Sequence, residues 1–144
     1  TSRILKRQKK KCCSIIAEDL ERIRARSSII IQEYADKLKK RVNELLAHAE
    51  LKIDEEILAR EVAIFADRSD ISEEVARLDS HLQQFAQCCN GIEQAGRRLD
   101  FISQEMLREA NTIASKASDT DTTRYVVDVK CQIDRIKEQV QNIE

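Results

Sequence analysis

The sequence predicts an all-α protein of about five helices, in which a long projecting N-terminal helix precedes antiparallel, coiled-coil-like helical hairpins. The 144 residues include no Pro and two Gly, and only 3% of them are aromatic. Sheet folds need β-branched and aromatic strands separated by tight Gly or Pro turns, so this composition favours a few long helices. Apolar residues also recur at steps of three and four through most of the chain, which is the spacing of amphipathic helices.

The first helix is predicted over residues 3–49, and its apolar positions follow a heptad pattern with one extra step of four. These positions are Ile16, Leu20, Ile23, Ser27, Ile30, Tyr34, Leu38, Val42, Leu45 and Ala49. Such a helix would be about 70 Å long, whereas a compact globule of this chain length is about 35–40 Å across. It must therefore project, and its apolar stripe needs a cover from the last helix or from another subunit. We expect residues 1–50 to form a connecting and oligomerisation helix, and residues 51–144 to form a helical domain.

Four shorter helices are predicted after this one. The second spans about 54–66 with Asp54 as its N-cap, and Asp70 with Glu73 forms a capping box for the third. After a loop at 90–96, the fourth helix spans 97–117, and the fifth is capped by Asp119 or Asp121. The predicted core stripes of the last three helices are Ile71, Val75, Leu78, Leu82, Phe85 and Cys89; Leu99, Ile102, Met106, Ala110, Ile113 and Ala117; and Val126, Val129, Ile133, Ile136, Val140 and Ile143.

Charge is unevenly distributed along the chain, although the net charge is only −1. Residues 1–11 contain six Lys or Arg and no acid, so the remaining chain, with 19 basic and 26 acidic residues, carries −7. A basic stripe of this kind can follow a phosphate backbone, although most charge runs are solvated helix ends.

Five cysteines without C-x-x-C spacing indicate reduced thiols in a cytosolic protein. No apolar segment is long enough to cross a membrane, and none resembles a signal peptide. The chain begins at Thr1 within the helical pattern, as a fragment of a longer protein would.

Two polar stretches are candidates for chemistry. In the predicted fourth helix, Glu105 and Glu109 place two carboxylates one turn apart, and such a pair can share a divalent cation. Ordinary surface pairing with neighbouring Lys and Arg is the alternative for these acids. The other stretch, residues 60–81, combines carboxylates with His81, which is either a proton-transfer group or a structural histidine beside the apolar stripe.

Phe101 lies on the polar side of the fourth helix, where it can stack on a nucleobase or pack against another protein helix. The chain contains no P-loop, G-x-G-x-x-G, H-E-x-x-H or serine elbow. These absences disfavour nucleotide-cofactor enzymes and the common zinc and serine hydrolases.

Three strings of the sequence resemble the YicC family, in the family's order. They run from Glu61 to His81, from Gly96-Arg97-Arg98-Leu99-Asp100-Phe101 to Lys116, and from Lys137 to Glu144. YicC-like proteins are bacterial, cytoplasmic, metal-dependent endoribonucleases that act on single-stranded RNA and form hexamers. They are about twice as long as this chain and have an N-terminal α/β region, so the resemblance implies that this chain is the helical half. Leu107 replaces the family's usual Asn, and Ala114 replaces its usual Gly.

The resemblance leads to a hypothesis about individual residues. Glu105 and Glu109, with Asp100, would hold Mg²⁺ or Mn²⁺, and His81 would transfer a proton. Phosphates would be positioned by Arg97, Arg98, Arg108 and Lys116.

The alternative is a non-catalytic oligomerisation and RNA-clamping scaffold whose catalytic groups lie in the missing N-terminal region. The expected partners are single-stranded RNA and further copies of the chain, as a hexamer in the family or a dimer here, with neither a membrane nor a nucleotide cofactor. A third interpretation, binding of a protein partner alone, predicts no salt-dependent affinity for RNA.

Overall fold

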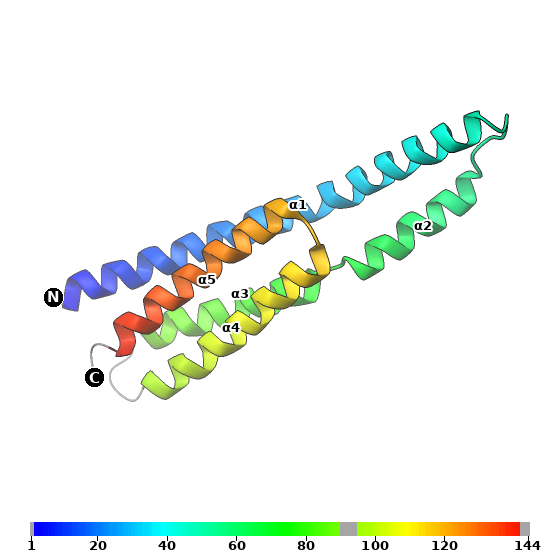
Figure 1. Cartoon of the computed structure of the whole chain (residues 1–144). Helices are drawn as coiled ribbons and strands as arrows, with labels where there is room; N and C mark the ends of the chain where they lie inside the picture. Colours follow the sequence, from blue (N-terminus) through cyan, green and yellow to red (C-terminus); the bar gives the residue numbers. More distant parts are fainter. Residues whose placement is uncertain (1, 90–94, 142–144) are drawn as a thin grey trace.

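The computed structural model describes residues 2–89 and 95–141, and within these ranges it contains five α-helices and no strand. The helices are α1 (Ser2–Ala47), α2 (Glu55–Arg68), α3 (Ser72–Cys89), α4 (Ala95–Ala117) and α5 (Thr120–Gln141) (Figure 1). The all-α prediction is therefore confirmed, and the predicted helix boundaries agree within two residues. The predicted loop at 90–96 lies mostly outside the described residues, and its last two residues belong to α4.

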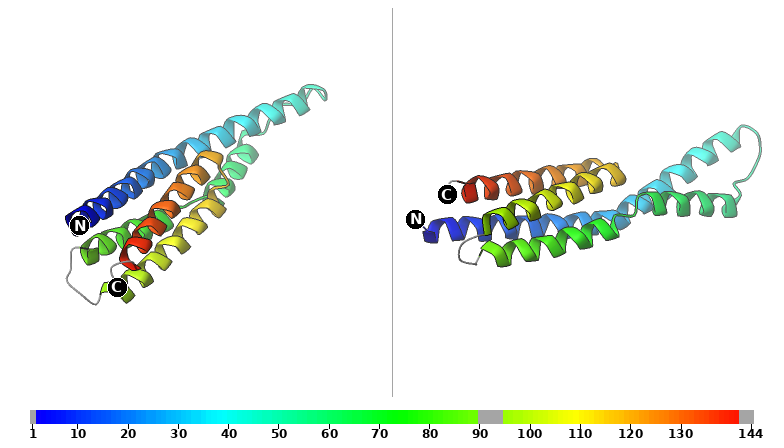
Figure 2. Two further views of the ribbon diagram at one scale, coloured as in Figure 1. Left: turned by 60° about the vertical axis from the view of Figure 1, so that its left-hand side comes forward. Right: turned by 90° about the horizontal axis from the view of Figure 1, so that it is seen from below.

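The first half of α1 packs with α3, α4 and α5 into an antiparallel four-helix bundle (Figures 1 and 2). In this bundle α1 lies against α3 and α5, and α4 also lies against α3 and α5. Apolar stripes from all four helices form the core: Cys12, Ile16, Leu20 and Ile23; Ile71, Val75, Leu78, Leu82 and Phe85; Leu99, Ile102, Met106, Ala110, Ile113 and Ala117; and Val126, Val129, Ile133 and Ile136. The predicted core is confirmed at all these positions of α3, α4 and α5, while the side chains of Cys89, Val140 and Ile143 lie outside the described residues.

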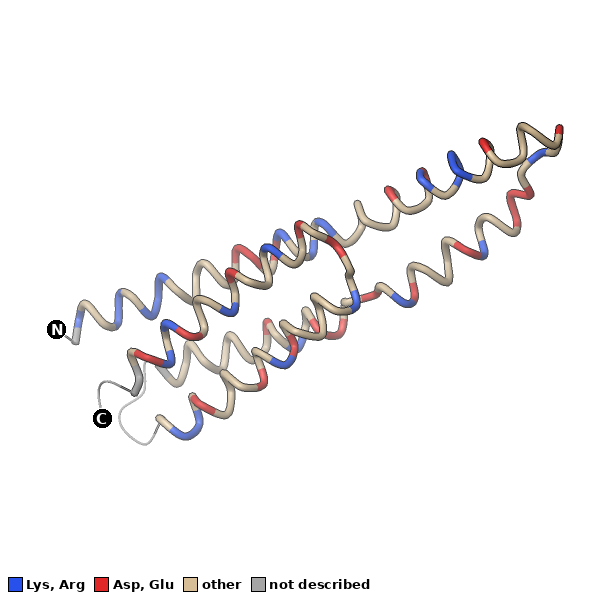
Figure 3. Tube along the Cα trace, viewed as in Figure 1, with Lys and Arg blue, Asp and Glu red and all other residues tan. Residues whose placement is uncertain are grey.

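The second half of α1 leaves the bundle and pairs with α2 in an antiparallel arm (Figure 2). We refer to residues 29–68 as the arm. None of the residues of α2 is buried, and the ring of Tyr34 stacks on that of Phe65 with centroids 3.8 Å apart. Charged residues of both signs lie along the arm (Figure 3). Two positions of the predicted α1 stripe are wrong: Leu45 is 66% exposed, and Ala49 is exposed beyond the end of α1. The stripe instead continues from Val42 by a step of four to the half-buried Leu46.

Two of the predicted helix caps form as expected. The side chain of Asp54 accepts hydrogen bonds from the backbone N–H groups of Glu56 and Ile57, at the start of α2. At the start of α5, the Asp119 carboxylate accepts from the N–H and the hydroxyl of Thr122, which selects Asp119 over Asp121 as the cap. Each cap satisfies amides that a helix start would otherwise leave unpaired.

The predicted capping box at α3 forms only in part. The Asp70 carboxylate accepts from the backbone N–H of Ser72, as a cap does. The N–H of Asp70, however, donates to the carbonyl of Asp67, and the carboxylate of Glu73 lies 3.6 Å from Arg77. The turn between α2 and α3 already gives the Asp70 N–H an acceptor, so the Glu73 carboxylate does not accept from that N–H as a capping box requires.

A buried acidic pair lies between α1 and α5. Asp19 is 2% exposed, and its Oδ1 accepts from Arg22, whereas its buried Oδ2 receives no donor from any described residue. Asp128 of α5 lies against Asp19, and burial together with this neighbour raises the pKa of Asp19 to about 7. The same contact with Asp19 lowers the pKa of Asp128, which also accepts from Gln132. When Asp19 is protonated, its carboxyl group can donate to Asp128, which would give the buried Oδ2 a hydrogen-bond partner.

This pair predicts a pH-dependent stability. The folded-state pKa of Asp19 lies above its unfolded value, so the native state binds one proton more than the unfolded state. The stabilisation of the native state by this proton is lost as pH rises through about 7. Asp19→Asn places an N–H donor toward Asp128 at every pH, so the fall in unfolding free energy between about pH 5 and about pH 7.5 should become smaller in urea titrations. Glu18→Gln, at an exposed neighbouring position, should leave that slope as it is. An unaltered slope in Asp19→Asn would contradict the protonation of Asp19.

Candidate active face on α3 and α4

Polar side chains gather where α3 and α4 pack side by side. Glu74, Arg77 and His81 follow each other at steps of three and four, so they share one edge of α3. Glu105, Glu109 and Lys116 lie along the neighbouring edge of α4. We refer to these six residues as the α3–α4 face.

Glu74 and Glu109 are buried carboxylates of this face, and each is paired with a cation of the facing helix. Glu74 also lies near Arg77 of its own helix, α3. The Lys116 Nζ donates to Glu74 Oε1 at 2.8 Å, and an Arg77 nitrogen lies 3.5 Å from the same oxygen. Arg77 Nε donates to Glu109 Oε1 at 2.9 Å. Because the Glu74 and Glu109 side chains are only 5% and 9% exposed, these bonds fix the register of α3 against α4.

The pKa values follow from this pairing. Burial by itself raises the pKa of Glu74, but the hydrogen bond from Lys116 and the nearby Arg77 outweigh it and hold the pKa below its ordinary value. The same bond raises the pKa of Lys116, and the bond to Glu109 raises that of Arg77. Glu74, Lys116 and Arg77 therefore stay charged near neutral pH and are poor proton-transfer groups.

Besides Glu74, whose Oε2 is buried without a hydrogen-bond partner among the described residues, two residues of the face have binding capacity left over. Glu105 is 23% exposed, and the ion pair described for it, with Arg108, is long at 3.8 Å. His81 is half-buried, and its Nδ1 is buried without a hydrogen-bond partner among the described residues. Since Arg77 meets Glu109, the antiparallel register puts His81 and Glu105 at the same level one turn further along.

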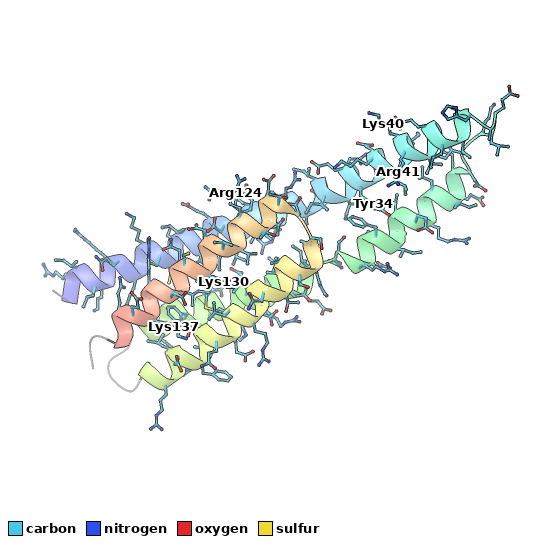
Figure 4. The ribbon with its side chains drawn as sticks, viewed as in Figure 1. Tyr34, Lys40, Arg41, Arg124, Lys130 and Lys137 are labelled. Carbon is cyan, nitrogen blue, oxygen red and sulfur yellow. The ribbon has the colours of Figure 1, made fainter. Side chains whose placement is uncertain are left out.

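Asp100 lies apart from the two glutamates with which it was predicted to share a metal ion. Its Oδ1 is 3.5 Å from the Nζ of Lys137, so it faces α5 and not α3. Figure 4 labels Lys137 on α5. Within residues 2–89 and 95–141, no three His, Cys, Asp or Glu side chains form a group that could hold a metal ion. A cation on Glu105 and Glu109 would therefore complete its shell with water and substrate oxygens, which Mg²⁺ tolerates.

The predicted phosphate-binding residues are accessible to different degrees. Arg97 and Arg98 are exposed in the first turn of α4, and the side chain of Arg108 is 74% exposed. Lys116 is bonded to Glu74 but remains 42% exposed. Phe101 is 62% exposed, which confirms that it lies outside the core.

The pairing roles of Glu74 and Arg77 were missed from the sequence. Their spacing with His81 was a usable signal, because three polar residues at helical steps beside the Val75 and Leu78 core positions mark an edge that a neighbouring helix can contact. Leu107 and Ala114 pack half-buried against the core.

These features describe a helical bundle with a polar, ion-paired face beside its core. The chain belongs to the family of YicC-like endoribonucleases, because the family model described as "Endoribonuclease YicC-like, C-terminal" matches residues 23–144. It is 45% identical over 132 residues to a protein of Clostridioides difficile (strain 630) named "Probable endoribonuclease YicC", an alignment that covers 92% of this chain and 45% of that protein.

A protein of Haemophilus influenzae with the same name is 33% identical over 129 residues, which cover 90% of this chain and 44% of that protein. The chain thus spans slightly less than half the length of the curated relatives it matches. In the described part of the chain, no helix has the length and apolarity that crossing a membrane requires.

The two kinds of glutamate on the α3–α4 face should respond differently to neutralisation. Glu74→Gln leaves Lys116 without its buried charged acceptor and leaves Arg77 with Glu109 alone, so the melting temperature should fall by about 5 °C. Glu105→Gln, which removes only a long and partly exposed pair, should change it by about 1 °C or less. Thermal unfolding followed by circular dichroism measures both, and equal shifts would contradict the structural role assigned to Glu74.

Proposed function

We propose that this chain is the helical C-terminal part of a metal-dependent endoribonuclease that cleaves phosphodiester bonds in single-stranded RNA. The observation that carries the proposal is the match of residues 23–144 to the YicC-like endoribonuclease family. Both curated relatives are named as probable endoribonucleases, which supports RNA as the substrate and, with it, a cytoplasmic location.

In this proposal the α3–α4 face lies against the scissile phosphate. Glu105 and Glu109 hold Mg²⁺ or Mn²⁺, which when bound activates water for attack on phosphorus. His81 transfers a proton, and this role is supported by its half-buried position at the level of Glu105. Asp100 is left out of the metal site because it faces α5.

Arg97, Arg98 and Arg108 contact the RNA backbone, since all three are exposed cations on α4. Lys116 joins them through the N–H groups that Glu74 does not use. Self-association is proposed for the arm, which exposes the apolar side chains of Ile29, Leu45, Ile57 and Ile64.

A second candidate function is that of a scaffold, in which this chain holds RNA and the catalytic groups come from elsewhere in a longer protein. It is favoured by the ion pairing of Glu109 with Arg77, which competes with a cation for the same carboxylate. The absence of a three-ligand group in the described residues favours it as well.

The two functions are separated by cleavage of a fluorescent single-stranded RNA by the whole protein that carries this chain, with EDTA and after added Mg²⁺ or Mn²⁺. Glu105→Gln, alone and with Glu109→Gln, should lower metal-dependent cleavage by about 100-fold or more. Asp100→Asn is the matched control on the other side of α4 and should cleave like the wild type. The single Glu105 variant matters because Glu109→Gln also loosens Arg77.

Cleavage that persists in both glutamate variants would refute the metal assignment and leave the scaffold function. Light scattering on the same samples tests self-association, for which a single-chain mass would be the contrary result. A wild-type protein that neither binds nor cleaves single-stranded RNA would refute both functions.

A further inference from the structure

The positive charge of the chain is concentrated in one helix. α1 contains 13 Lys or Arg and 6 Asp or Glu, a net charge of +7, so the rest of the chain carries −8 at the overall charge of −1. Within α1 the excess lies in the first turns, where six cations between residues 3 and 11 are accompanied by no acid (Figure 3). Glu18 and Glu21 end this run further along the helix.

Four of these cations point away from the bundle. At 100° per residue, Arg3, Arg7, Lys10 and Lys11 share an arc of about 100° that is opposite the buried positions Cys12 and Ile16. All four are exposed, and the structure describes no ion pair for any of them within residues 2–89 and 95–141. We call these four residues the basic segment. It presents a stripe of unneutralised charge about 12 Å long.

The neighbouring helices do not cancel this charge. Residues 82–89, the end of α3 that lies at the same end of the bundle, contain no charged side chain. Residues 131–141 of α5 contain two basic and two acidic side chains, and the first turns of α4 contain Arg97, Arg98 and Asp100, a net charge of +1. Gln139 of α5 donates to Gln8 of α1, which fixes the two helix ends together.

The arm provides the contrast. Its cations Lys37, Lys39, Lys40 and Arg41 are as numerous as those of the basic segment and equally exposed. They are surrounded by acids, however, because residues 29–68 contain seven Lys or Arg and nine Asp or Glu. A polyanion is attracted by the sum of all nearby charges and not by single cations. The summed charge is positive at the start of α1 and negative along the arm, so the electrostatic attraction is stronger at the start of α1.

We propose that the basic segment of α1 is a second binding site for the phosphate backbone of single-stranded RNA, separate from the α3–α4 face. This inference rests on the proposed function for its ligand, while the position of the site follows from the charges of α1. Exposed Lys and Arg bind phosphates without reading bases, and the affinity is therefore non-sequence-specific and sensitive to salt. RNA held at this end would extend toward the exposed Arg97 and Arg98 of α4.

The test is the salt dependence of binding, measured by fluorescence anisotropy with a labelled single-stranded RNA of mixed sequence. One variant changes all four residues of the basic segment to Gln, which keeps helix propensity high and touches no buried group. Its matched control changes Lys37, Lys39, Lys40 and Arg41 to Gln, with the same loss of charge from the same helix. Circular dichroism confirms the fold of each.

At low salt, the affinity of the basic-segment variant for the RNA should be lower than that of the wild type by a factor of about 100 or more. The slope of its log affinity against log salt concentration should be smaller in magnitude by about 3. The arm variant should keep a slope close to that of the wild type. Equal losses in the two variants, or none in the basic segment, would overturn the inference while leaving the proposed function intact. Loss of binding to phosphatidylglycerol vesicles but not to RNA would overturn it in favour of a membrane surface. A wild-type protein without affinity for the RNA would refute the site together with the proposed function.

Discussion

The length of α1 is the constraint on which the rest of the structure depends. Its 46 uninterrupted residues make it about twice as long as α4 or α5, so no single helix of the chain can cover it. α3 and α5 bury its first half, and α2 folds back along its second half because exposed apolar positions there still need a neighbour. The division into a well-buried bundle and a lightly buried arm follows from this mismatch.

The ion pairs between α3 and α4 connect this architecture to function. Arg77 and Lys116 neutralise two carboxylates that would otherwise be buried and unpaired, and that requirement fixes how the two helices are aligned. The alignment then brings His81 to the level of Glu105, outside the ion-paired group. The contacts thus pair Glu74 and Glu109 as structural groups and leave Glu105 as the acid of the face with only a long ion pair, so Glu109 can bind a cation only in competition with Arg77. This distinction separates the catalytic and scaffold functions.

Much of this arrangement could be predicted from the sequence because helix periodicity is a local property. Apolar spacing identified the cores of α3, α4 and α5, and Asp54 could be recognised as a cap from its own neighbours. Which helices touch is a non-local property, and spacing alone does not contain it. Asp100 and Glu105 were therefore predicted to share one metal ion. In the structure Asp100 lies near Lys137 of α5, whereas Glu105 lies on the side of α4 that packs against α3, one turn from the pair of Glu109 with Arg77.

The same reason explains the other differences. Nothing in the local sequence marks Asp19 as a buried acid, because its neighbour Asp128 lies on a helix more than a hundred residues away. The amide of Asp70 was assigned to Glu73, but the turn from α2 satisfies it. The apolar stripe of α1 likewise continues at Leu46 and not at the predicted Leu45, because the side of a helix that becomes buried is set by the position of the helix packed against it.

We propose that single-stranded RNA binds the bundle end of α1 and not the arm. The most direct measurement is lysine modification by an amine-reactive reagent, read by mass spectrometry with and without single-stranded RNA. RNA should protect Lys10 and Lys11 and leave Lys37, Lys39 and Lys40 as reactive as before. Protection of the arm lysines to the same degree, or no protection of Lys10 and Lys11, would contradict it.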